Sequence, residues 1–271
     1  MGPEQMIPIL EQITKYSSLP VIVKPNAGLP KQKNGQTYYD VSPEEFAEVM
    51  KKIVEMGAVV IGGCCGTTPD HIKAMADACR MIPIKPVEKK NFTMVSSYGQ
   101  SVFLGTGSKI IGERINPTGK KRFKQALKEH DLDYILREGI TQQDNGAHIL
   151  DVNVGLPDID EPALMKEVVQ ELQSVTSLPL QIDTVDVEAM EGALRIYNGK
   201  AMVNSVSGKQ ESMDKVFPLI QKYGGVVIGL ALDENGIPAD AEGRVQVAKK
   251  IMQKRQSMGS KRKISSLTHW Q

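Results

Sequence analysis

Short apolar segments alternate with amphipathic segments along most of the chain, and no other sequence feature limits the possible folds as much. Val, Ile and Leu occupy consecutive positions in the apolar segments, which is typical of parallel strands that are buried on both faces. Strands that alternate with helices predict a parallel α/β architecture. The predicted strands are Pro20–Val23, Ala58–Ile61, Lys109–Gly112, Ala147–Leu150, Leu180–Ile182, Ala201–Val203 and Val226–Leu230.

The amphipathic segments carry the signals of helix ends. Ser42 and Thr68 are N-cap residues, and each is followed by Pro, which is favoured in the first helical turn. Gly57 and Gly146 stand where helices should stop. The predicted helices are Gln5–Lys15, Pro43–Met56, Pro69–Arg80, Asp131–Asn145, Pro162–Thr176, Val187–Tyr197, Ser212–Lys222 and a segment from Ala241 onward.

Polar residues follow every predicted strand. In a parallel barrel the carboxyl ends of the strands form the rim where ligands bind and chemistry takes place. Polar endings after all the predicted strands therefore indicate a functional rim rather than chance surface polarity. These endings are Lys24–Gly28, Gly62–Thr68, Glu113–Gly119, Asp151–Gly155, Asp183–Thr184, Asn204–Ser205 and Asp233–Gly236.

A change in composition near residues 83–108 divides the chain, because Pro, Ser, Gly and Thr replace the regular pattern there. Two strand–helix units precede this segment and about five follow it, fewer than the eight of a closed barrel. The predicted fold class is therefore α/β, with two incomplete (β/α)8 TIM-barrel pieces joined by a linker. We assign residues 1–88 to the first piece, 89–108 to the linker, 109–253 to the second piece and 254–271 to a separate tail.

Charge and composition argue against several classes of function. The 271 residues hold 33 Lys and Arg against 32 Asp and Glu, and this balance argues against nucleic acid as the main partner. No apolar run approaches the roughly 18 residues of a membrane span, and the N-terminus lacks the basic region of a signal peptide. The three cysteines suit a reducing compartment. We therefore expect a cytoplasmic protein without a membrane partner.

Two adjacent cysteines, Cys64 and Cys65, follow the second predicted strand within a glycine-rich turn. Thiolates are preferred zinc ligands, and two of them at a strand end could face one ion. The residues alone leave two alternatives, a pair of small buried apolar side chains and a vicinal disulfide. Cys79, on a predicted helix, is expected to serve packing.

The segments Val23–Pro30 and Ile61–Pro69 resemble the end of a homocysteine S-methyltransferase barrel. The resemblance implies that Cys64 and Cys65 are zinc ligands and that the zinc holds the homocysteine sulfur as a nucleophilic thiolate. It also implies that Asn26 orients the homocysteine, although a turn-forming Asn beside Gly is an equal alternative. The family's third cysteine ligand would lie just before Met1.

Four segments of the second piece resemble the pterin-binding barrels related to dihydropteroate synthase, and most of all the methyltetrahydrofolate domain of cobalamin-dependent methionine synthases. They are Lys109–Gly119, His148–Gly155, Gln181–Thr184 and Met202–Val206. A pterin ring presents a row of donors and acceptors, to which carboxylates and amides are complementary. Helix N-capping is the alternative role for the aspartates. The resemblance implies a pterin-binding shell of Asp151, Asn153, Asp183, Asn204 and Asp233, with Glu113 and Asn116 at the rim.

Together the two resemblances imply methyl transfer from 5-methyltetrahydrofolate, through cobalamin, to homocysteine, which gives methionine. Zinc, methyltetrahydrofolate and cobalamin are the implied cofactors, and we expect the cobalamin to be bound by a separate domain or protein. The polar shell would favour protonation of the folate N5, which makes N5 a better leaving group. Two alternatives stay open, a stand-alone pterin-binding methyltransferase that acts on a corrinoid protein and a truncated product without function.

The tail 254–271 differs from the rest of the chain, because no Asp or Glu follows Glu242. The tail breaks the alternation of helices and strands. When its sequence is back-translated and the reading frame is shifted by one base, the new sequence contains a strand and an Asp-Pro-Leu sequence typical of the family. We therefore expect an out-of-frame tail on an internal fragment whose open barrels are poorly soluble and inactive alone. A genuine basic tail that contacts anionic surfaces is the alternative.

Overall fold

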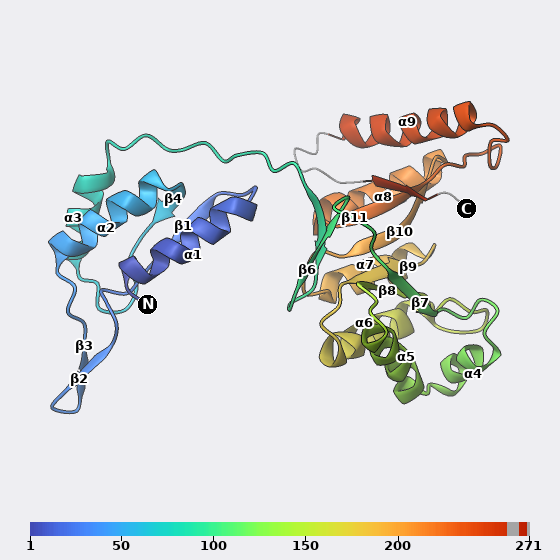
Figure 1. Ribbon diagram of the computed structural model, residues 1–271, viewed down its shortest axis with the longest axis horizontal. Helices are drawn as coiled ribbons and strands as arrows, with labels where there is room; N and C mark the ends of the chain where they lie inside the picture. Colours follow the sequence, from blue (N-terminus) through green and yellow to red (C-terminus); the bar gives the residue numbers. More distant parts are fainter. Residues whose placement is uncertain (259–265, 270–271) are drawn as a thin grey trace. The chain divides into compact units, whose positions relative to one another are not determined.

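The chain forms two compact units, residues 1–91 and residues 92–271, which are shown with their elements in Figure 1. The computed structural model describes residues 1–258 and 266–269. Within these residues, no helix has both the length and the apolar character needed to cross a lipid bilayer. Each unit has its own hydrophobic core.

Two parallel strands and three helices make up most of the first unit. The strands β1 and β4 pair in parallel, and the exposed strands β2 and β3 form an antiparallel hairpin. Ser42 caps α2 in a capping box with Glu45, as its sequence indicates. Cys79 is buried in the core beside Phe46 and Met50, which confirms its packing role. The elements are α1 (Pro3–Tyr16), β1 (Val21–Val23), β2 (Lys31–Lys33), β3 (Gln36–Tyr38), α2 (Pro43–Glu55), β4 (Ala58–Ile61) and α3 (Pro69–Cys79).

Six parallel strands form the main sheet of the second unit, in the order β12-β11-β10-β9-β8-β7. Strands that are neighbours in the chain are neighbours in the sheet, because helices return the chain to the start of the next strand. The α/β class with a parallel sheet is therefore confirmed. The elements are β7 (Ile111–Ile115), α4 (Lys121–Glu129), α5 (Leu132–Asp144), β8 (Ile149–Val152), α6 (Glu161–Val175), β9 (Leu180–Asp183), α7 (Val187–Ile196), β10 (Met202–Ser207), α8 (Gln210–Tyr223), β11 (Val226–Leu230), α9 (Ala241–Ser257) and β12 (Ser266–His269).

The two faces of this sheet have different surroundings, because successive strand residues point to opposite sides. One set, which includes Leu150, Ile182 and Val203, packs against the helices in the main core. The opposite set includes Ile149 and Met202, which belong to a smaller apolar cluster. We call this second side the inner face. Near the carboxyl ends of the strands, the inner face carries polar residues instead.

A β-hairpin covers the apolar part of the inner face, which corrects the prediction of a linker over residues 89–108. It consists of β5 (Thr93–Ser96) and β6 (Ser101–Leu104). Val95 and Val102 are buried against apolar side chains of the sheet. Burial of these side chains stabilises strands in a segment whose composition indicates a loop.

Further elements differ from the predictions, and the β2–β3 hairpin of the first unit is one that they do not include. The chain forms α4, which the sequence analysis does not include. Helix α9 continues to Ser257, beyond the predicted boundary at 253, and Lys254 forms an ion pair with Asp214 at 2.8 Å. The backbone of β12 pairs in parallel with β11. The rest of the tail, residues 259–265 and 270–271, lies outside the described residues, and the out-of-frame reading stays a prediction.

The Tyr197 hydroxyl ties the hairpin to the sheet. It donates to the Ser96 carbonyl oxygen at 2.9 Å and accepts from the Leu180 N–H at 3.0 Å. Burial raises the pKa of Tyr197 to about 12, so the phenol stays protonated and can donate. The hydroxyl therefore satisfies a donor on β9 and an acceptor on β5.

We predict that Tyr197→Phe lowers the free energy of unfolding by about 1–3 kcal/mol, because the Leu180 N–H loses this acceptor and the Ser96 carbonyl keeps only the Lys200 N–H. Chemical denaturation measures this change. Tyr98→Phe is the matched control, since Tyr98 lies at the tip of the same hairpin and is 56% exposed. An equal loss in both variants would contradict a tie between hairpin and sheet.

Candidate functional site

A cavity of about 690 Å³ lies at the polar ends of the inner face of the second unit. Strands β7 to β11 and the segments that follow them contribute its lining. Seven residues make up the predicted pterin shell and rim, and five of them line this cavity. The polar and charged lining residues are Glu113, Asn116, Thr118, Asp151, Gln181, Asp183, Asn204, Ser205 and Arg244.

Two carboxyl groups, those of Asp151 and Asp183, form the buried part of this cavity. Asp151 is 3% exposed and accepts a hydrogen bond from Gln181 Nε2. Asp183 accepts from Asn153 Nδ2 at 3.0 Å. Asn153 does not line the cavity itself, and it acts on the cavity through Asp183. The predicted capping role fails for Asp183, because Asp186 supplies the cap of α7.

Burial raises the pKa of both carboxyl groups. Desolvation is the largest cause for Asp151, and the nearby Asp183 carboxyl adds to it, so that the pKa of Asp151 rises to about 7. Desolvation also raises the pKa of Asp183, while the hydrogen bond from Asn153 opposes the rise. The pair therefore favours a state with one shared proton near neutral pH, as two adjacent carboxyls do.

Gln181 is a lining residue that the sequence analysis does not single out. Its side chain is 4% exposed, and its Oε1 is buried without a hydrogen-bond partner among the described residues. An unpaired buried acceptor is costly unless a ligand supplies a donor. Gln181 stands two residues before Asp183, and this spacing places both on one face of a strand. That spacing is the signal by which Gln181 could have been found.

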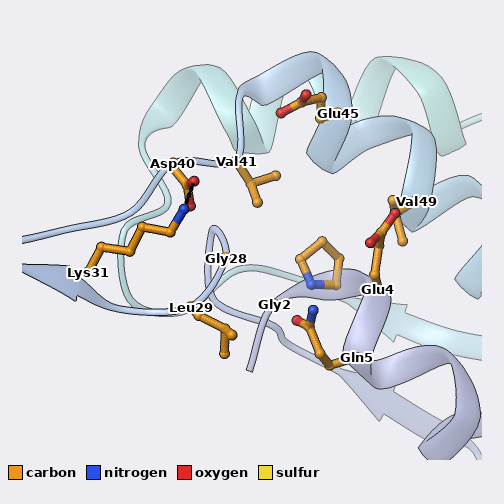
Figure 2. A pocket seen from close by; sticks show the side chains of 11 residues that line it. Gly2, Glu4, Gln5, Gly28, Leu29, Lys31, Asp40, Val41, Glu45 and Val49 are labelled. Atoms are coloured by element: carbon orange, nitrogen blue, oxygen red, sulfur yellow. Dashed lines mark hydrogen bonds and ion pairs between the residues drawn. The ribbon is translucent and has the colours of Figure 1, made fainter.

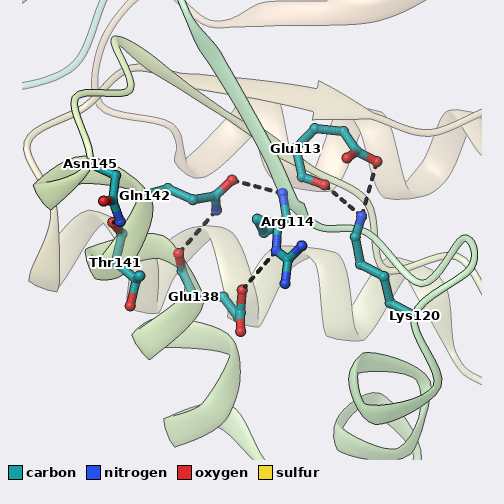
Figure 3. Close-up of polar contacts among 7 residues, drawn as sticks. All are labelled: Glu113, Arg114, Lys120, Glu138, Thr141, Gln142 and Asn145. Atoms are coloured by element: carbon teal, nitrogen blue, oxygen red, sulfur yellow. Dashed lines mark hydrogen bonds and ion pairs between the residues drawn. The ribbon is translucent and has the colours of Figure 1, made fainter.

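The rim residues Glu113 and Asn116 both line the cavity. Glu113 lies toward solvent, and its Oε1 pairs with Lys120 Nζ at 3.0 Å (Figure 3). Asn116 is 8% exposed and accepts from the Thr118 N–H at 2.8 Å. Asn204 also lines the cavity, on β10, where it is the register partner of Asp183.

Asp233 does not belong to this cavity, which corrects its place in the predicted shell. It lines a separate cavity with residues of α9, and its Oδ1 accepts from the Asn235 N–H at 2.9 Å. The side chain therefore stabilises its own turn, a common role of Asp in loops. Arg244, in the first turn of α9, lines the main cavity instead. No strand-end pattern points to it, because it comes from a helix.

The predicted zinc ligands Cys64 and Cys65 lie in the turn after β4 of the first unit. Both are free and exposed, and their Sγ atoms are 3.8 Å apart, which excludes the vicinal disulfide and the buried apolar pair. Two thiolates bound at about 2.3 Å to one tetrahedral zinc would lie about 3.8 Å apart. The two sulfurs therefore fit as part of a zinc site. Among the described residues, no group of three or more His, Cys, Asp or Glu side chains is arranged to hold a metal.

Asn26 holds the cysteine turn in place. Its Oδ1 accepts from the Cys65 N–H at 3.2 Å, and the next residue, Ala27, donates its N–H to the Cys65 carbonyl at 2.9 Å. Gly66 has a φ of +80°, and a Cβ there would lie 2.3 Å from Tyr39 Cγ. Asn26 and Gly66 thus shape the turn that presents both thiols.

A smaller cavity of about 330 Å³ also lies in the first unit, as Figure 2 shows. Gly2, Gly28 and Val49 contribute to its wall, and Lys31 pairs with Asp40 at one side. Neither cysteine lines this cavity. It is therefore separate from the predicted zinc ligands.

Comparisons with known proteins agree with both resemblances. The Homocysteine S-methyltransferase family matches residues 1–79, and the Pterin binding enzyme family matches residues 112–266. Methionine synthases of Mycobacterium leprae and Mycobacterium tuberculosis are 31% and 32% identical to this chain over 93% of its length. The chain spans 22% of the length of each of these relatives.

Solved structures of dihydropteroate synthases are similar at lower identity. The enzyme from Xanthomonas albilineans is 17% identical, with a TM-score of 0.48 over 66% of this chain and 64% of that one. The enzyme from Vibrio fischeri is 15% identical, with a TM-score of 0.44 over 62% of each chain. The family match covers more than half of the residues, from β7 to β12. The N-terminal segment, residues 1–79, is similar to the homocysteine S-methyltransferase family, and the chain belongs to the pterin-binding enzyme family.

Proposed function

We propose that the cavity of the second unit binds the pterin ring of 5-methyltetrahydrofolate and that the first unit supplies zinc ligands for homocysteine. The reaction would be the transfer of the folate methyl group to the homocysteine sulfur, which gives methionine. Relatives that bear the name methionine synthase support this assignment.

The arrangement of Asp151, Gln181 and Asp183 carries the proposal. These side chains present carboxyl oxygens and the unpartnered Gln181 Oε1 along one wall of a cavity. The amino-pyrimidine edge of a pterin has several N–H donors in a row, which match such acceptors. Asn204, on the neighbouring strand β10, adds an amide that can both donate and accept. An apolar ligand would leave these buried groups without partners.

A proton on the carboxyl pair serves the chemistry as well as binding. The methyl group leaves folate from N5, and N5 is a poor leaving group unless it gains a proton. Burial raises the pKa of Asp151 to about 7, which lets this carboxyl donate a hydrogen bond near neutral pH. The surrounding amides would orient the ring and exclude water. The polar side chains that line the cavity would then together favour protonation of N5.

Cys64 and Cys65 would hold the zinc, together with ligands from outside this pair. A bound zinc would keep the homocysteine sulfur as a thiolate at neutral pH. Asn26 would fix the backbone that presents the two thiols. Cobalamin, as the methyl carrier, is part of the proposal through the resemblance to methionine synthases.

The folate site is tested by paired Asp→Asn changes. We predict that the unaltered chain binds 5-methyltetrahydrofolate and that Asp183→Asn weakens this binding by about 10- to 100-fold, the loss of a charge-assisted hydrogen bond. Asp233→Asn, the same change outside the cavity, should leave the affinity unchanged. Isothermal titration calorimetry measures both. No binding by the unaltered chain would favour the truncated, non-functional product.

The zinc ligands are tested by metal titration. We predict that the chain binds one zinc ion and that Cys64→Ser and Cys65→Ser each weaken this binding at least 10-fold, because a thiolate ligand is lost. Cys79→Ser is the control, since this thiol is buried in the core. Competition with a chromophoric chelator gives the affinities. Equal affinities in all variants would favour a stand-alone pterin-binding methyltransferase over the proposed activity.

The raised pKa of Asp151 makes stability depend on pH. The pKa of Asp151 is higher in the folded chain than in the unfolded chain. The contribution of this carboxyl to the free energy of unfolding is therefore fully present below about pH 4 and is lost as the pH rises through about 7. Asp151→Asn removes the titration. We predict that the variant gains stability relative to the unaltered chain, by on the order of 1–3 kcal/mol, between pH 5 and pH 8. Chemical denaturation of both chains at pH 5 and pH 8 measures this difference. The same change in stability with pH in both chains would contradict the prediction.

A further inference from the structure

Strand β7 contains a β-bulge just before the residues that line the cavity. Gly112 pairs with Leu150 of β8, and Ile115 pairs with Val152, so three steps along β7 match two steps along β8. The extra residue lies between these pairs, at Glu113 and Arg114. A bulge of this kind changes which side of the sheet the following residues face.

The bulge changes the face of every residue after it. Ile111 and Glu113 line the cavity, as alternation requires. Without a bulge, Ile115 would face the cavity and Asn116 would face the helices. Instead Ile115 is fully buried in the helix-side core, and Asn116 lines the cavity. The bulge therefore allows Glu113 and Asn116, an odd number of residues apart, to reach one ligand site.

The side chain of Gln142, on α5, holds this bulge (Figure 3). Its Oε1 accepts from the Arg114 N–H at 2.7 Å, and its Nε2 donates to the Glu138 carbonyl at 3.0 Å. Gln142 is 7% exposed, so both ends of the amide are used in a buried place. Arg114 Nε also lies 3.6 Å from Glu138 Oε2, which adds a contact on the same helix. Helix α5 thus binds both the backbone and the side chain of the bulged residue.

Gly112 provides the space that this amide needs. A Cβ at Gly112 would lie 2.6 Å from Gln142 Oε1 and 3.0 Å from its Cδ. Any larger residue would therefore push the amide away from the Arg114 N–H. Two positions that are thirty residues apart in the sequence serve the same hydrogen bond.

We infer that Gln142 is a positioning residue for the folate site, although it does not line the cavity. It stabilises the bulge that turns Asn116 toward the ligand while Glu113 keeps its place. Loss of the amide leaves the Arg114 N–H without its acceptor on α5, and a regular register would then compete with the bulge. This inference rests on the proposed function, because it names a residue that serves the same cavity.

Affinity for 5-methyltetrahydrofolate tests the inference in the full chain. Gln142→Ala should weaken binding at least 10-fold, and Gln142→Glu, which keeps an acceptor for the Arg114 N–H, should restore most of it. Gln143→Ala is the matched control, because the neighbouring Gln143 accepts from Thr176 instead of contacting β7. It should leave the affinity within about threefold. Equal losses in Gln142→Ala and Gln143→Ala would overturn the inference.

A double variant distinguishes a positioning role of Gln142 from a general loss of stability. In a chain that carries Asn116→Ala, the change Gln142→Ala should cost much less affinity than it does alone, because the residue it positions is already lost. Full additivity would overturn the inference. Gly112→Ala should weaken binding as Gln142→Ala does, and the two changes together should lose little more than either alone.

Hydrogen exchange distinguishes failure of this inference from failure of the proposed function. The Arg114 amide should be protected in the unaltered chain and should exchange at least tenfold faster in Gln142→Ala, but not in Gln143→Ala. Unchanged protection would overturn the role of Gln142 whatever the ligand. If the unaltered chain binds no folate, the proposed function fails, and the positioning role for a folate site fails with it. Binding without an effect of Gln142→Ala removes only the inference.

Discussion

The parallel pairing of β7 to β11 in chain order is the constraint on which the rest of the second unit depends. Parallel strands place all their carboxyl ends at one edge of the sheet. Residues that are thirty or more positions apart, such as Asp151 and Asp183, thereby become neighbours in one cavity. The helices cover the opposite face with apolar contacts, and the cavity lies on the inner face.

The polar ends of this face would be unstable without an apolar support. The β5–β6 hairpin supplies that support, since Val95 and Val102 pack beside Ile149 and Met202. Beyond this apolar cluster lie the two buried carboxyl groups, and their own burial raises the pKa values of Asp151 and Asp183.

Several features follow from particular sequence signals. The seven predicted strands all occur, and runs of Val, Ile and Leu mark them even where one face is exposed, as at Ile22 of β1 and Val60 of β4. The hairpin and α4 were missed, since their strand and helix signals are short and depend on contacts with distant residues. Asp233 was placed wrongly, because a polar residue after a strand can equally stabilise its own turn. Gln181 was missed although it shares a strand face with Asp183.

The sequence by itself determined the α/β class, the order of strands and helices, and which types of side chain end each strand. These follow from hydrophobic periodicity and from local capping rules, which act over a few residues. Only the tertiary structure decided which polar residues meet, which lose contact with water and which backbone groups need a side-chain partner. The bulge held by Gln142 is the clearest case, because its hydrogen bond joins positions 114 and 142 and depends on the space left by Gly112.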